Sequence, residues 1–389
     1  MGPTLDWVNL VVRWLHLTTG IAWIGSSFYF IWLDRHLTPP TAPRPAVDGE
    51  VWMVHSGGFY RVERRRIGPA ELPPLLHWFK WEAMLTWASG MVLLAVVYYL
   101  TGGALLVDPA VSSLSVTQST WVALGTLAGS WIIYDLLWRS PLGRAPGAAT
   151  AVSLLLLSVV TFVLFRLLSG RAAYIHVGSL LGTIMVANVW AVILPAQQQM
   201  IDATKRGQEP DYSLGEQAKR RSVHNSYMTL PVLFLMLSTH FPQTYGHRLG
   251  WVILLLLAVA GAAARHAMIG RSARRLWAFV PMTASFLVVV ALATPRAAPT
   301  AADSASAVSF AEVRSVIHAR CLTCHSAFPT DDMFRVAPNG VMFDTPQQIQ
   351  VAAPRIVQRA ATQRTMPPGN KTGMTDNERA LLTRWSEAR

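Results

Sequence analysis

The chain has 389 residues, of which 52% are hydrophobic and only 14% charged, with a formal net charge of +12. A charge of this size is common in nucleic-acid-binding proteins, but here the basic residues stand between long apolar stretches, as they do in the loops of membrane proteins. The composition therefore favours a protein of the lipid bilayer and excludes nucleic acid as a partner.

Eight apolar stretches of about twenty residues, the length that crosses a bilayer, predict membrane helices. Their spans are 8–33, 76–100, 120–138, 148–169, 173–195, 226–241, 248–266 and 276–294. The first contains Arg13 and His16 and has no basic segment before it, so we expect it to be retained and not cleaved as a signal peptide. The predicted fold class is all-α: a polytopic membrane helix bundle of about eight spans, followed by a small helical domain.

Basic residues distinguish the two sides of this predicted bundle. The loops after the odd-numbered spans hold most of the arginines and lysines, whereas the opposite loops hold only Arg166, Arg171 and Arg248. Because cytoplasmic loops carry the excess of positive charge, the N-terminus and the C-terminal domain are predicted to lie outside.

Three histidines, His16, His176 and His240, fall in the outer half of the predicted bundle. Ionisable side chains are costly in lipid and usually mark sites, so two of the three could bind the iron of a non-covalent haem b. Gly20 shares the face of His16 and would let a flat cofactor approach the backbone. The alternative is that each histidine is hydrogen-bonded within the bundle, and the sequence does not choose a pair.

The inner side gathers a second set of polar residues. They stand in His77-Trp78-Phe79-Lys80-Trp81-Glu82, in Gln197-Gln198-Gln199 and in Arg221-Ser222-Val223-His224-Asn225. Amide, imidazole and cationic groups backed by tryptophans suit a pocket for a flat, anionic ring that forms hydrogen bonds. The alternative interpretation is an interfacial belt of aromatic residues and snorkelling cations.

The C-terminal part has a different composition. The segment from Thr294 to Ser309 is rich in Ala, Pro and Ser and predicts a flexible tether. The predicted domains are therefore residues 1–295 in the membrane, a tether over 296–309 and a soluble domain over 310–389. Within the last, helices are expected from Phe310 to Arg320 and from Asp376 to Glu387.

The only two cysteines stand in Cys321-Leu322-Thr323-Cys324-His325. In C-x-x-C-H the two thiols attach a haem c covalently and the histidine binds its iron, whereas a zinc site would need further ligands. Met366, in a proline-stiffened loop, is the expected sixth ligand, and Met333, Met342 and Met374 are the alternatives. Haem c is attached on the outer side of a membrane, in agreement with the loop charges.

These residues resemble one family, the bacterial membrane-bound urate oxidases, or urate hydroxylases, that carry a C-terminal cytochrome c domain. The resemblance rests on Arg13-Trp14-Leu15-His16, His77 to Glu82, Trp131-Ile132-Ile133-Tyr134-Asp135, His176-Val177-Gly178, Arg221 to Asn225, Cys321 to His325 and Met366 to Asn370. The first helix also has a short, distant similarity to membrane protoporphyrinogen oxidases, which supports His16 as a haem b ligand.

The resemblance implies oxidation of urate to 5-hydroxyisourate, with electrons passing through haem b and haem c to a soluble or membrane cytochrome or terminal oxidase, and without direct formation of peroxide. Lys80, Asn188 and Asn225 are expected to bind the urate anion. Glu82, Asp135 or His224 is expected to accept a proton. The alternative is a non-catalytic membrane cytochrome linking a quinol or a dehydrogenase to a soluble cytochrome. In that case urate alone would not reduce its haem.

Overall fold

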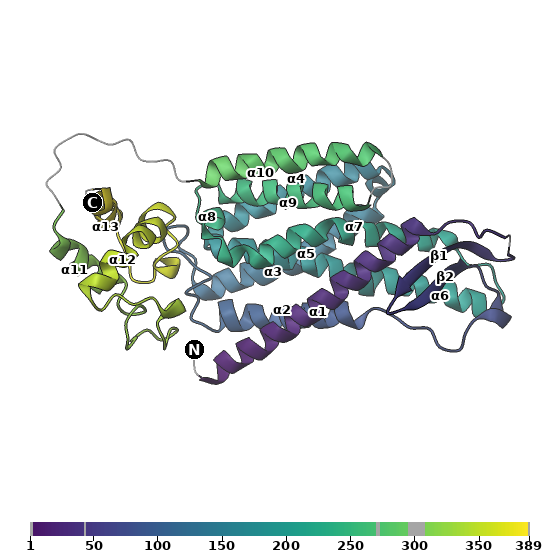
Figure 1. Ribbon diagram of the computed structural model, residues 1–389, viewed down its shortest axis with the longest axis horizontal. Coiled ribbons are helices and arrows are strands. Elements are labelled where there is room, and N and C mark those ends of the chain that lie inside the picture. Colours follow the sequence, from purple (N-terminus) through teal and green to yellow (C-terminus); the bar gives the residue numbers. More distant parts are fainter. Residues whose placement is uncertain (1–2, 43, 270–272, 295–307, 388–389) are drawn as a thin grey trace.

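The computed structural model describes residues 3–42, 44–269, 273–294 and 308–387 (Figure 1). A long helical bundle occupies the middle of the molecule, the C-terminal helices lie at one end, and a β-hairpin lies at the other. We call these the outer and the inner end. The N-terminus of the first helix, α1 (Pro3–His36), lies at the outer end with the C-terminal helices.

The bundle is built from apolar helices that run back and forth between the two ends. They are α1, α2 (Trp81–Leu94), α3 (Val116–Arg139), α4 (Pro146–Leu167), α5 (Gly170–Asn188), α6 (Leu194–Lys205), α7 (Tyr212–Leu237), the short α8 (Pro242–Tyr245), α9 (Gly250–Ile269) and α10 (Phe279–Ala293). Two π-helical segments interrupt the regular geometry: η2 (Ala95–Tyr99) continues α2, and η4 (Val189–Ile193) joins α5 to α6.

Six helices among the described residues are long and apolar enough to cross a membrane. They are Trp81–Tyr99, Val116–Arg139, Pro146–Leu167, Gly170–Lys205, Gly250–Ile269 and Arg275–Ala293. The other two of the eight predicted spans correspond to α1 and α7, which are long enough but not apolar enough to be counted among these six. Serines, threonines and His16 dilute the apolar run of α1, and the first half of α7 is polar.

Helix α5 forms the centre of the bundle. It packs against α2, α3, α4 and α7. Most of its residues between Ala172 and Asn188 are buried. Gly178 allows α7 to approach closely, because a Cβ atom there would lie 2.9 Å from Cβ of Leu235. The small residue therefore serves helix packing, as small-xxx-small pairs usually do.

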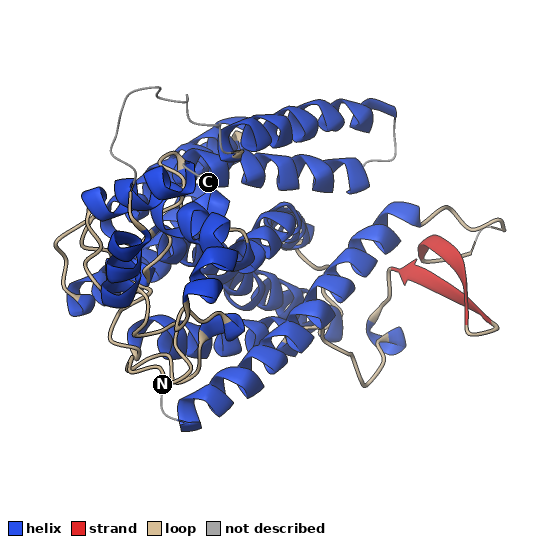
Figure 2. Ribbon diagram, turned by 60° about the vertical axis from the view of Figure 1, so that its left-hand side comes forward, coloured by secondary structure: helices blue, strands red, loops and turns tan. Residues whose placement is uncertain are grey.

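The prediction of an all-α fold is wrong at the inner end. Strands β1 (Val47–His55) and β2 (Gly58–Arg65) pair antiparallel and form a hairpin, the only strands among the described residues (Figure 2). Ser56 and Gly57 form its two-residue turn, with φ of +49° and +77°. Positive φ at both central residues is the requirement of the turns that match strand twist. The hairpin is held to the bundle by an ion pair of 2.9 Å between Arg64 and Asp34 of α1.

The C-terminal helices form a unit with its own hydrophobic core. Helices α11 (Phe310–Arg320) and α13 (Asp376–Glu387) have the predicted bounds, and α12 (Pro346–Ile356) lies between them. Capping boxes at Ser309 and Thr345 begin α11 and α12. The predicted tether over 296–309 falls largely outside the described residues.

Two glycines allow this unit to rest directly on the outer end of the bundle. A Cβ atom on Gly369 would lie 2.5 Å from the carbonyl oxygen of Val107. A Cβ atom on Gly246 would lie 2.6 Å from the carbonyl oxygen of Gln363. Backbone therefore meets backbone across the interface, and Met333 and Phe334 of the unit add apolar contacts to the core of the bundle.

Candidate functional site

The inner half of the bundle contains a buried polar network along one face of α7. Residues four apart lie on the same side of a helix, and here Arg221, Asn225 and Thr229 are all buried. The side-chain amide of Asn188, on α5, donates to Oδ1 of Asn225 at 2.9 Å. The amide of Asn225 donates to the carbonyl oxygen of Met185 at 2.9 Å. Asn188 and Asn225, both predicted from the sequence as binding residues, are therefore in direct contact.

His224 joins this network through Tyr134 of α3. The Tyr134 hydroxyl lies 2.7 Å from Nδ1 of His224 and accepts a longer bond, 3.3 Å, from Asn188. Because it accepts from Asn188, its own hydrogen is free to be donated to His224. The indole of Trp138 packs against the imidazole, with ring centroids 4.2 Å apart.

Asp135 is held between two arginines. Its Oδ1 atom accepts from Arg221 at 2.8 Å, and its Oδ2 atom lies 2.6 Å from Nε of Arg139. Arg221 is almost fully buried and also lies over the ring of Tyr134, 4.8 Å from its centroid. Both carboxylate oxygens of Asp135 are therefore engaged by guanidinium groups.

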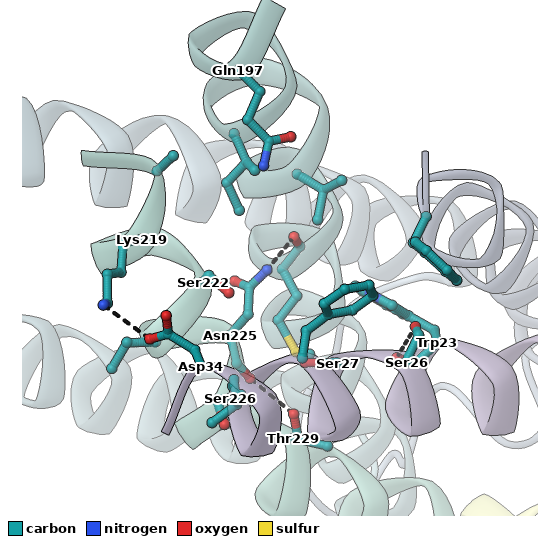
Figure 3. A pocket seen from close by; sticks show the side chains of 18 of the residues that line it. Trp23, Ser26, Ser27, Asp34, Gln197, Lys219, Ser222, Asn225, Ser226 and Thr229 are labelled. Atoms are coloured by element: carbon teal, nitrogen blue, oxygen red, sulfur yellow. Dashed lines mark hydrogen bonds and ion pairs between the residues drawn. The ribbon is translucent and has the colours of Figure 1, made fainter. Parts of the chain in front are cut away.

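A cavity of about 670 Å³ opens beside this network (Figure 3). We call it the inner pocket. Polar side chains that line it come from α1, α6 and α7 and include Trp23, Ser26, Ser27, Asp34, Gln197, Lys219, Ser222, Asn225, Ser226 and Thr229. His77 and Trp78, in the segment before α2, also line it. Lys219 and Asp34 form an ion pair of 3.0 Å at its rim. The walls thus offer hydroxyls and amides, which can both donate to and accept from a ligand.

Lys80 and Glu82 lie near this pocket but are not among its lining residues. The ammonium group of Lys80 is placed over the indoles of Trp78, Trp81 and Trp190, 5.6 to 5.7 Å from their centroids. The sequence prediction gave this cation the urate anion as its partner and did not foresee the three aromatic faces. Among the described residues, Oε2 of Glu82 is buried and has no hydrogen-bond partner.

The three outer histidines have different surroundings. Nδ1 of His16 donates to the carbonyl oxygen of Thr86 at 2.9 Å, which leaves the lone pair on Nε2. His176 uses both nitrogens, since Nδ1 donates to Ala172 and Nε2 accepts from the Tyr99 hydroxyl at 2.9 Å. His240 is exposed in the turn η5 (Ser238–His240) after α7. Only His16 therefore has a free, oriented nitrogen.

In the C-terminal unit, His325 shows the same pattern. Its Nδ1 atom donates to the carbonyl oxygen of Val341 at 2.9 Å, so Nε2 carries the lone pair. Cys321 and Met366 pack against the same hydrophobic core. Burial raises the pKa of Cys321 to about 12 and that of Cys324 to about 11. Both groups are therefore neutral thiols at physiological pH, unlike the thiolates of redox-active C-x-x-C motifs.

No group of three or more His, Cys, Asp or Glu side chains that could hold a metal ion occurs among residues 3–42, 44–269, 273–294 and 308–387. A haem bound through one histidine and one methionine needs no such group.

Sequence reasoning missed several residues of the inner site. Tyr134 was quoted only as part of a motif, and Ser27 and Thr229 were not singled out. A hydroxyl on an apolar helix gives a weak signal, because serine and threonine can bond to the backbone of their own helix, as Thr229 also does with the carbonyl oxygen of Asn225. Their roles follow only from the way α1, α3 and α7 meet.

Comparison with known proteins identifies the membrane part. Residues 3–295, well over half of the chain, match a family described as urate oxidase N-terminal. No curated protein and no solved structure matches the chain. The matched residues include the whole inner pocket, and the match supports an oxidoreductase that acts on urate in a membrane. The chain therefore belongs to the urate oxidase N-terminal family.

Proposed function

We propose that the protein oxidises urate to 5-hydroxyisourate in the inner pocket and passes the electrons to a haem c in the C-terminal unit. The single observation that carries the proposal is the inner pocket itself. It lies within the residues that match the family, and its hydroxyl and amide walls suit a ring with alternating N–H and C=O groups.

Asn225 is the central binding residue in this proposal. Its amide uses one N–H for Met185 and one oxygen lone pair for Asn188, so one donor and one acceptor position remain for the ligand. Ser27 and Ser222 line the same cavity. Asn188 does not line it and acts by fixing the orientation of Asn225.

Glu82 is the proton acceptor that we favour. Of the three residues predicted from the sequence, Asp135 is committed to two arginines and Nδ1 of His224 to Tyr134. Glu82 alone has a buried carboxylate oxygen without a partner among the described residues. Phe79, which lines the pocket, stands three residues before Glu82, in the segment that leads into α2.

The reaction balances as urate plus water giving 5-hydroxyisourate, two protons and two electrons. In the C-terminal unit, Cys321 and Cys324 would attach the haem, and His325 and Met366 would bind its iron. When bound, this haem supplies one-electron acceptance and passage to a respiratory cytochrome or terminal oxidase. The oriented Nε2 of His325 suits binding of the haem iron. We also propose a periplasmic location for this unit.

Haem b is a second expected cofactor, and the residues fit it at one position only. His16 offers a free Nε2 atom and lies two helical turns, about 10 Å, along α1 from Trp23 of the inner pocket. His176 would have to give up its bond to Tyr99, and His240 lies outside the bundle. One-electron relay over about 30 Å of bilayer is the chemistry that a haem near His16 would supply.

The test is anaerobic addition of urate to the purified full-length protein while the reduced haem bands are recorded. Reduction by urate is expected, and Asn225→Leu should abolish it, whereas dithionite should still reduce the haem of the variant. If urate reduces nothing in the wild-type protein while dithionite does, the chain is an electron-transfer cytochrome without urate chemistry.

A further inference from the structure

A second cavity, of about 850 Å³, lies between the outer end of the bundle and the C-terminal unit. We call it the interface pocket. Its bundle side is formed by residues of the loop before α3, of the junction between α4 and α5, of α8 and the loop after it, and of the end of α10. Its other side is formed by the segment from Arg359 to Arg379, which includes Met366. It is distinct from the inner pocket, which lies near the opposite end.

The interface pocket is lined by more cations than anions. Five arginines, Arg171, Arg248, Arg359, Arg364 and Arg379, face two carboxylates, Asp108 and Asp376. Arg364 forms an ion pair of 2.9 Å with Asp376. Arg379 is buried and donates to the carbonyl oxygen of Met366 at 3.0 Å and to Asn370 at 3.1 Å. These two arginines are therefore already engaged within the unit.

The remaining three arginines have no carboxylate of the described residues within ion-pair distance. Nε of Arg171, on the bundle side, is buried and makes no hydrogen bond within the described part of the chain. Arg359, on the other side, is half-buried. Desolvated cations without a counter-ion are costly, so positions of this kind usually take an anionic ligand.

We propose that the interface pocket binds a small organic anion carrying two or more carboxylate groups, held by Arg171 from the bundle and by Arg359 from the C-terminal unit. Two carboxylates are needed because the unpaired cations stand on both sides of the cavity. Guanidinium groups bind carboxylates through paired hydrogen bonds, which also fixes the ligand's orientation. A cavity of this volume accommodates a small-molecule ligand.

Gln363 adds a second feature to the site. Its Oε1 atom is buried and has no hydrogen-bond partner among the described residues, and Gln363 lines the interface pocket. A bare carbonyl oxygen favours a ligand that also carries a hydroxyl group. Such an anion would bridge the two units and neutralise cations that otherwise repel each other, so its binding should favour the docked arrangement of the C-terminal unit.

The experiment is calorimetric titration of the full-length protein in detergent with citrate, which carries three carboxylates and a hydroxyl. One molecule is expected to bind, with affinity that falls as salt is added. Arg171→Gln and Arg359→Gln should each weaken binding by about tenfold to a hundredfold, the effect of losing one charge-assisted contact. The matched controls are Arg166→Gln and Arg314→Gln, exposed arginines of the bundle and of the unit that do not line the pocket.

Three outcomes would overturn the proposal. The first is that wild-type protein takes up no citrate. The second is that the control variants lose as much affinity as the pocket variants, which would mean a general attraction of the basic surface. The third is that citrate does not bind while Arg359→Gln alters the haem spectrum or potential. That result would assign the arginines to the carboxylates of the haem, with no role for a free anion.

Discussion

Replacing Gly246 by alanine is expected to separate the C-terminal unit from the bundle. A Cβ atom at this position would lie 2.6 Å from the carbonyl oxygen of Gln363 and 2.6 Å from Cγ2 of Thr365. The first contact is with a backbone atom, which cannot move away by a change of rotamer as a side chain can. Gly246 itself has φ of −83°, which alanine adopts without strain, so the main effect is on the interface.

The magnitude follows from the cost of overpacking. Inserting a methyl group into a close contact typically costs about 1–3 kcal/mol. Since about 1.4 kcal/mol corresponds to a factor of ten, the ratio of docked to undocked molecules should fall roughly 5-fold to 150-fold. A further contact of 2.8 Å with the carbonyl oxygen of Pro242 lies within the turn of α8, so a small part of the cost falls on the bundle.

Hydrogen–deuterium exchange of the full-length protein, read by mass spectrometry, is the assay. Peptides covering 359–374 should exchange faster in the variant, while those of α11 in the core of the C-terminal unit stay protected. Gly129→Ala is the matched control, because a Cβ atom there would meet open space. If the Gly246 variant and this control exchange alike, the close approach described here does not hold the unit in place.

Three further substitutions test other parts of the structure. Met366→Ala should change the low-spin spectrum and lower the potential of haem c, and an unchanged spectrum would rule this ligand out. Lys80→Met should lower the melting temperature while urate affinity stays within about twofold, because its ammonium group contacts three indoles, each such contact being worth about 0.5–2 kcal/mol. A tenfold loss of affinity at unchanged melting temperature would instead place Lys80 on urate. For Glu378, burial alone would raise the pKa, but bonds from Thr375 and Arg320 hold it below its ordinary 4.5. The ionised Glu378 side chain thus stabilises the fold fully above pH 4.5, and this stabilisation is lost as the pH falls through the lower pKa of the folded state. Glu378→Gln should therefore lower the free energy of unfolding by about 1 kcal/mol at neutral pH, and the free energy of unfolding of the variant should depend less on pH in the acid range.

Two helices of the C-terminal unit, α11 and α13, could be predicted to the residue because their signals are local, whereas α12 was not predicted. Ser309 is followed three residues later by Glu312, and the structure contains the resulting capping box. The hairpin had local signals as well, with alternating residues on both sides of Ser56 and Gly57. They were overlooked because the segment was interpreted only as a loop between membrane helices.

The candidate site was predictable in part. Asn188 and Asn225 were both expected to bind the urate anion, and the structure brings their side-chain amides together. The two arginines around Asp135 could not be foreseen, since Arg221 reaches it from a helix that begins 14 residues before the predicted span, at Tyr212. Nor does a sequence show that three indoles will meet above Lys80, because Trp190 comes from a distant helix.

The π-helical segment η2 has a consequence for the comparison of related chains. A π-helical turn holds one residue more than an α-helical turn, and each residue advances the helix by about 100°. The extra residue between Trp87, which binds Thr183, and Tyr99, which binds His176, is what allows both contacts to α5 from the same helix. Loss of a single residue in this stretch would keep the first contact and turn Tyr99 away from His176. The number of residues separating these two positions should thus be more strictly maintained among relatives than the identity of the residues between them.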